Sequence, residues 1–163
     1  MKTSFSRTLV SILILLCLIS ALSSCSTVQY SDIVDCSYIT SSIKTEYPLN
    51  DGYSEYSSEE INYMLEPSLF DSCSVIYSNS SDNIDEIGVF HAKDKASADI
   101  LLENITQYVE SVKKEKSDFL RNYLPSEISK LESGEVKQFG NYVVFAFSEN
   151  SGQIFKQITN ILR

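Results

Sequence analysis

The spacing of hydrophobic positions predicts one long helix in the second half of the chain. Between residues 95 and 123, apolar side chains recur every three or four positions, which is typical of a helix with one buried face. The positions between them carry charged side chains that we expect to face solvent. Leu124-Pro125 ends the pattern, because proline cannot continue a helix. The apolar positions are Ala98, Leu101, Leu102, Ile105, Tyr108, Val109, Val112, Phe119 and Tyr123.

Two pairs of short strands flank this helix. Their residues are rich in β-branched and aromatic side chains, and turn-forming residues separate the members of each pair. Residues 142–147 (YVVFAF) are apolar on both faces, which is typical of a central strand. We therefore expect two hairpins, formed by residues 74–77 with 85–93 and by residues 136–139 with 141–148.

Shorter amphipathic segments complete the expected secondary structure. Ser57 and Glu60 fit a capping box that opens a helix through Leu65. The other expected helices cover residues 32–43, 126–131 and 153–162. After residue 72 the order is strand, strand, helix, twice over. The sequence thus predicts an α+β fold, with an antiparallel four-stranded sheet built from two ββα units. We expect the long helix and the C-terminal helix on one face and the N-terminal helices at the edge.

The first 25 residues have the order of a bacterial lipoprotein signal. Lys2 and Arg7 form a short basic region, and residues 9–22 form an apolar run. As a helix that run would rise only about 21 Å, too little for a hydrocarbon core of about 30 Å. Leu22-Ser23-Ser24-Cys25 resembles a lipobox, which implies cleavage before Cys25 and a lipid on its sulfur. Two acyl chains give a stable membrane anchor.

This interpretation divides the chain into a signal at residues 1–24, a tether at residues 25–30 and one domain at residues 31–163. It predicts an anchored, extracytoplasmic protein at the outer face of the cytoplasmic membrane. The formal net charge is −9, and it becomes −11 when the signal takes Lys2 and Arg7 away. So acidic a chain is expected to repel nucleic acid.

The remaining cysteines, Cys36 and Cys73, leave two alternatives open. Outside the cytoplasm they can form a disulfide. Otherwise they are two buried free thiols, which behave as small apolar side chains.

Four tyrosines gather in and just after a loop rich in turn residues: Tyr47, Tyr53, Tyr56 and Tyr63. Aromatic side chains on a loop stack on sugars or peptides, or they pack the loop onto its own domain. We take these four as a candidate binding surface.

No group of residues predicts a catalytic or metal site. His91 is the single histidine, and it falls in a strand on the side of Ile87 and Val89, so a structural role is expected. Asp82, Asp85 and Glu86 surround a turn, but their spacing does not match a calcium loop. We expect no cofactor and no bound metal.

Four short segments between Leu69 and Leu162 carry a resemblance: residues 85–90 (DEIGVF), 92–94 (AKD), 123–127 (YLPSE) and 139–143 (FGNYV). With them the stretch resembles a family of small lipoproteins of Gram-positive bacteria that carry a domain of unknown function. It implies an envelope lipoprotein and names no activity or cofactor.

Three functions follow as hypotheses. The first is a non-enzymatic accessory or binding module of the envelope, with an envelope protein or wall polymer as partner. The second is an envelope enzyme that uses carboxylates such as Asp85 and Glu86 on wall polymer. The third is a purely structural envelope protein. The absence of a catalytic motif favours the first.

Overall fold

A computed structural model describes residues 29–163 of the chain. The predicted signal and Cys25 lie outside the described residues. Within residues 29–163, no helix combines the length and the apolarity needed to cross a membrane.

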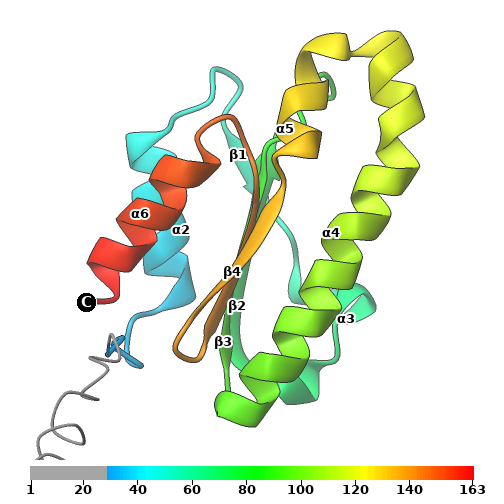
Figure 1. Ribbon diagram of the computed structural model, residues 1–163. Coiled ribbons are helices and arrows are strands. Elements are labelled where there is room, and N and C mark those ends of the chain that lie inside the picture. The colour runs from blue at the N-terminus through cyan, green and yellow to red at the C-terminus, as the bar shows by residue number, and fades with distance from the viewer. Residues whose placement is uncertain (1–28) are drawn as a thin grey trace, which may run out of the picture.

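The fold is a five-stranded antiparallel sheet with helices on both faces (Figure 1). The strand order is β1-β2-β3-β5-β4, so the two predicted hairpins meet where β3 pairs with β5. The strands are β1 (Tyr53–Glu55), β2 (Phe70–Ser78), β3 (Glu86–Ala92), β4 (Glu135–Phe139) and β5 (Tyr142–Phe147).

One strand of this sheet, β1, was not predicted from the sequence. β1 lies within the loop that we expected between the first two helices. It is three residues long and pairs with β2 alone, through the register Tyr53 to Ser78. A strand of three residues is too short to show an alternation of apolar and polar positions, and turn residues flank it in the sequence. The predicted four-stranded sheet is therefore corrected to five strands.

The described residues contain five α-helices and two short 3-10 turns. The long helix begins at Lys95 and ends at Tyr123, as its periodicity predicted. The capping box of Ser57 and Glu60 is also present. The helices are α2 (Cys36–Glu46), α3 (Ser58–Met64), α4 (Lys95–Tyr123), α5 (Ile128–Glu132) and α6 (Ser151–Ile161), and the 3-10 turns are η1 (Pro67–Leu69) and η2 (Pro125–Glu127).

The helices divide between the two faces of the sheet, contrary to our expectation. Figure 1 shows α2 and α6 on one side, and α3, α4 and α5 on the other. The long helix and the C-terminal helix therefore lie on opposite faces, and α2 covers a face instead of an edge. The physical reason lies in β5, whose six residues are all buried and supply two cores in alternation. Val143, Phe145 and Phe147 pack with α4, whereas Tyr142, Val144 and Ala146 pack with α2 and α6.

The N-terminal segment, residues 30–35, is fastened to one end of the sheet. The Ser31 amide donates to the carbonyl of Leu162 at 2.7 Å. The Asp32 carboxylate accepts from Asn141 Nδ2 at 2.9 Å and lies 3.4 Å from His91 Nε2. The Tyr142 hydroxyl donates to the Val34 carbonyl at 2.6 Å. Helix α2 begins at Cys36, four residues later than expected, and Asp35 is its N-cap.

Candidate functional site at the polar end of the sheet

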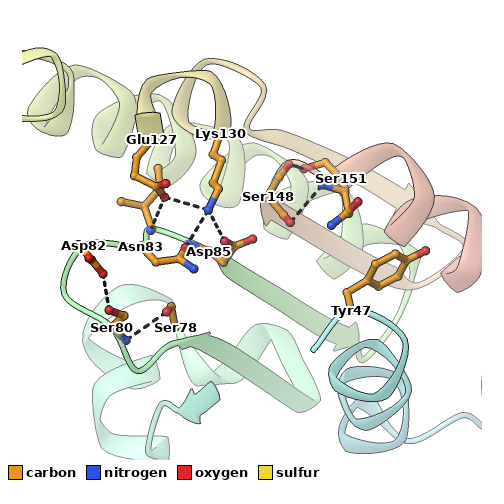
Figure 2. Close-up of polar contacts among 12 residues, drawn as sticks. Tyr47, Ser78, Ser80, Asp82, Asn83, Asp85, Glu127, Lys130, Ser148 and Ser151 are labelled. Atoms are coloured by element: carbon orange, nitrogen blue, oxygen red, sulfur yellow. Dashed lines mark hydrogen bonds and ion pairs between the residues drawn. The ribbon is translucent and has the colours of Figure 1, made fainter. Parts of the chain in front are cut away.

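A buried lysine forms the centre of the opposite end of the sheet. Lys130 lies on α5, and its Nζ contacts Asp85 Oδ2 at 2.6 Å, Glu127 Oε2 at 2.9 Å and Asn83 Oδ1 at 3.0 Å. Figure 2 shows these four side chains converging from the β2–β3 turn and from the η2–α5 segment. We call them the polar-end cluster. The Lys130 side chain is only 9% exposed and that of Asp85 only 5% exposed.

The local sequence explains how these groups meet. Pro125 stops the long helix, and the chain then turns back through η2, which begins at that proline. Glu127 and Lys130 are three residues apart on the short helical segment that follows, a spacing that places side chains on one face. The β2–β3 turn supplies the other two groups, with the Asp85 amide donating to Asn83 Oδ1 at 2.9 Å.

Each hydrogen of the Lys130 ammonium has an acceptor. An ammonium group carries three donors, and the cluster provides three oxygens. Burial by itself lowers the pKa of Lys130, but the hydrogen bonds to Asp85 and Glu127 raise it above its usual value. Lys130 is therefore an ammonium at neutral pH. Glu127 Oε2 also accepts from the Ile84 amide at 3.1 Å.

A cavity of about 440 Å³ opens beside this cluster, and we call it the polar-end cavity. Glu127 belongs both to the cluster and to the cavity wall. Asp82 is exposed at the rim and accepts a hydrogen bond from the Ser80 hydroxyl, a contact drawn in Figure 2. The other lining residues are Pro48, Leu49, Asn50, Asp51, Ser78, Ser80, Asn83 and Ser126.

A second hollow, of about 870 Å³, lies between the α3–η1 segment and α4, and we call it the α3–α4 groove. Its lining includes Asn62, Tyr63, Asn104, Gln107 and Tyr108. The groove and the polar-end cavity share no lining residue.

Glu86 is buried near this groove without a cation. Its Oε1 accepts from the Tyr108 hydroxyl at 2.7 Å, and the residue is 5% exposed. None of the ion pairs within residues 29–163 includes it. Burial raises the pKa of Glu86, and the Tyr108 hydrogen bond and the charge of Lys116 offset only part of that rise.

The two carboxylates considered for catalysis, Asp85 and Glu86, are therefore engaged with different partners. Asp85 binds Lys130 on α5, whereas Glu86 binds Tyr108 on α4. Asp82 stays apart from both, at the exposed turn. Within residues 29–163, no group of three or more His, Cys, Asp or Glu side chains is arranged to hold a metal ion.

The four tyrosines of the candidate binding surface do not form one cluster. Tyr47 and Tyr53 pack with the core under α2 and α6, and the Tyr53 hydroxyl donates to the Tyr47 carbonyl at 2.9 Å. Tyr56 packs on the opposite face, where its ring lies 4.6 Å from that of Tyr77. Tyr63 alone is largely exposed, at 85%, and lines the α3–α4 groove.

Cys36 and Cys73 are free thiols in the structure. Cys36 belongs to the core under α2 and α6, whereas Cys73 packs against the core under α4. The sheet therefore lies between the two side chains. The Cys36 thiol lies 3.3 Å from Ser72 Oγ, and burial raises its pKa to about 11.

His91 joins strand β3 to the N-terminal segment. Besides its contact with Asp32, its ring lies 4.5 Å from that of Tyr142, on the side of Ile87 and Val89 that the sequence indicated.

Sequence reasoning missed Lys130, Glu127 and Tyr108. A Glu and a Lys three residues apart on a short helix were a visible signal. Their burial was not visible, because it depends on where Pro125 turns the chain.

The matching family model is that of a domain of unknown function, DUF4358, and it covers residues 49–148. That range includes β1 to β5, the polar-end cluster and the groove. No curated protein and no solved structure matches the chain. Since the match spans more than half of the sequence, the chain belongs to the DUF4358 family.

Proposed function

We propose that this chain is a lipid-anchored binding module of a bacterial cell envelope, held at the outer face of the cytoplasmic membrane through Cys25. Its partner is an envelope protein or wall polymer, and it is not an enzyme. The basic region, the apolar run and the sequence Leu22-Ser23-Ser24-Cys25 support the anchor. The family match supports a shared domain and leaves its activity open.

The observation that carries the binding role is the complete pairing of the polar-end cluster. A lysine nucleophile or base must be a neutral amine, whereas Lys130 is held as an ammonium by three acceptors. Asp85 is bound to this ammonium and Glu86 to a tyrosine, so neither is free to attack a polymer. What the cluster does supply is a rigid wall for the polar-end cavity, and a fixed polar wall favours binding.

The position of the N-terminal segment supports an orientation for this module. Five residue steps separate Cys25 from Tyr30, and a chain of that length spans at most about 18 Å. Asp32 lies beside His91, near the last residue of β3, whereas Asp85 precedes the first residue of that strand. The polar-end cavity and the N-terminal segment therefore lie at opposite ends of β3, which supports a cavity that is turned away from the anchored end.

Site-specific photocrosslinking on intact cells tests this role. The photo-reactive p-benzoylphenylalanine replaces Asp82 at the cavity rim in one strain and Tyr38, an exposed residue of α2, in the other. We expect position 82 to capture one envelope component reproducibly and position 38 not to capture it. Equal capture from both positions, or none from either, would favour the purely structural alternative.

The anchor has a separate test. A Cys25→Ser variant is expected to leave the membrane fraction, because no thioether-linked lipid can form. If the variant stays in the membrane fraction as firmly as the parent, the lipoprotein interpretation is wrong.

A further inference from the structure

The α3–α4 groove is lined by uncharged amide side chains and an exposed aromatic ring. We propose that it binds a neutral oligosaccharide, which names a ligand class for the proposed binding module. The inference rests on that binding role and not on the lipid anchor. The groove volume of about 870 Å³ is within the range of small-ligand sites.

Uncharged amides supply the polar part of this groove. Asn62 and Asn104 line it from its two sides, and neither makes a side-chain hydrogen bond within residues 29–163. Gln107 donates to Glu103 at 3.4 Å, and its side-chain carbonyl has no partner among the same residues. An amide both donates and accepts hydrogen bonds, as do the hydroxyl and acetamido groups of a sugar. Three such side chains in one groove therefore fit a ligand with many hydroxyl groups.

Tyr63 adds an aromatic face beside these amides. The residue is 85% exposed, so its ring is accessible to a ligand in the groove. The face of an aromatic ring carries partial negative charge, and the C–H groups of a sugar ring carry partial positive charge. A sugar unit can therefore stack on Tyr63 while its hydroxyl groups reach Asn62 or Asn104.

The charge of the protein excludes polyanions from this groove. Glu66 is the one charged residue in the lining, and the whole chain is at −9. Phosphate-rich polymers are repelled by such a surface, whereas a neutral glycan is not.

The floor of the groove is fixed before any ligand arrives. The Tyr108 hydroxyl is held by Glu86 at 2.7 Å, and its ring packs at 5.4 Å against that of Phe145. Because the floor does not have to be ordered on binding, a ligand loses less free energy there.

Titration of the full chain in detergent micelles with the β-1,4-linked tetramer of N-acetylglucosamine tests the proposal by calorimetry. We expect saturable binding that weakens at least about tenfold in Tyr63→Ala and in Asn104→Ala. The matched control is Tyr38→Ala, since Tyr38 is 60% exposed on α2, on the opposite face of the sheet. Tyr38→Ala is expected to keep the parental affinity.

A neutral, N-acetylated tetrapeptide amide serves as the competing probe. If the peptide binds and the tetrasaccharide does not, the ligand class is wrong. If neither binds, or if Tyr38→Ala weakens binding as much as Tyr63→Ala, the groove is not a glycan site. The photocrosslinking experiment at position 82 tests the proposed binding role separately, because Asp82 lines the polar-end cavity and not the α3–α4 groove.

Discussion

Asp85 and Glu86 are neighbours in the sequence, and each is buried to about the same extent, at 4% and 5% exposure. Asp85 belongs to the polar-end cluster, where the Lys130 ammonium neutralises it. Glu86 lies under the long helix, where its partner is the uncharged hydroxyl of Tyr108. Asp85 thus has a buried cation as its partner, whereas Glu86 has an uncharged hydroxyl group.

A buried carboxylate next to an ammonium keeps its charge, and its free energy depends on that one cation. A buried carboxyl with only a neutral donor gains from holding its proton instead. The polar-end cluster therefore depends on the single cation of Lys130, which holds the β2–β3 turn through Asn83 and Asp85. The Glu86–Tyr108 pair depends on no cation and holds an aromatic floor in place. Changes at each region should separate these two behaviours.

The largest effect is expected when Lys130 is replaced. Lys130→Met keeps the unbranched stem of the side chain without its ammonium group and leaves Asp85 and Glu127 buried without a cation. Removing one partner of a buried ion pair costs about 3–5 kcal/mol. Urea unfolding of the variant at pH 7 measures this loss.

An exposed ion pair provides the comparison. Arg121 and Glu132 are 3.5 Å apart, with both side chains more than 60% exposed, so Arg121→Ala should cost less than about 1 kcal/mol. Adding Asp85→Asn to Lys130→Met should restore part of the stability, because it removes one of the uncompensated charges. If Lys130→Met unfolds at the same urea concentration as the parent, the polar-end cluster does not depend on the Lys130 cation.

A smaller loss is expected from a methyl group placed under Phe145. Gly88 is in β3, and a Cβ there would lie 2.1 Å from Phe145 Cε1. Phe145 in turn packs against Tyr108. Gly88→Ala should therefore displace the aromatic floor and destabilise the fold by about 1–3 kcal/mol. Thermal unfolding measures the loss.

Gly152 is the matched control for this change. It is in α6, and a Cβ there would meet nothing within 4 Å. Gly152→Ala should be neutral or stabilising by less than about 1 kcal/mol, because alanine favours the helix. Equal stabilities of the two alanine variants would contradict the close contact of Gly88 with Phe145.

The smallest effect concerns pH and distinguishes Glu86 from Asp85. Burial raises the pKa of Glu86 above its ordinary value of 4.5, so the folded state keeps this proton to a higher pH than the unfolded state does. Its stabilising contribution is therefore present below pH 4.5 and is lost as the pH rises through the raised folded pKa. Glu86→Gln keeps an acceptor for Tyr108 and removes this loss. The variant should be more stable than the parent at pH 7, and the two should converge in acid.

Urea titrations at a series of pH values test this, with Glu115→Gln as the control, since Glu115 is exposed on α4, the helix that carries Tyr108. The control should follow the parent throughout. A Glu86→Gln variant that is less stable than the parent at pH 7 would show that Glu86 is held as an ion.

Several parts of the fold could be predicted because their information is local. The 3–4 spacing of Leu101, Ile105, Val109 and Val112 fixes a helix whatever it packs against. Gly140 has a φ of 62°, a conformation that glycine tolerates, and it lies between the two strands of the hairpin expected from residues 136–139 and 141–148.

The layers could not be predicted in the same way. Residues 142–147 have apolar side chains on both faces of the strand, so helices must pack on both faces of the sheet. The sequence does not show which helix packs on which face. That depends on the pairing of β3 with β5, a contact between distant parts of the chain. Strand β1 was missed for a related reason, since its partner β2 alone defines it.

The candidate sites depended still more on distant contacts. The tyrosine loop pointed to Tyr63, but it also included Tyr47, Tyr53 and Tyr56, which the sheet separates from it or from one another. The sequence around Lys130 is that of an ordinary exposed helix, whereas in the fold the β2–β3 turn places Asn83 and Asp85 against its ammonium group. A sequence shows which residues are charged, whereas only the fold shows which charges are compensated.

The fastening of residues 30–35 also has a mechanical consequence. The bonds of Ser31 to Leu162 and of Asp32 to Asn141 tie the start of the described chain to its end and to the turn before β5. Tension arriving from the N-terminal side therefore enters the domain through α6 and the central strands β3 and β5 together. Pulling on this segment must break several hydrogen bonds at the same time. Pulling on an edge strand such as β1 would break its hydrogen bonds to β2 one after another. Residues 30–35 are therefore expected to resist separation from the sheet when the chain is pulled from its N-terminal side.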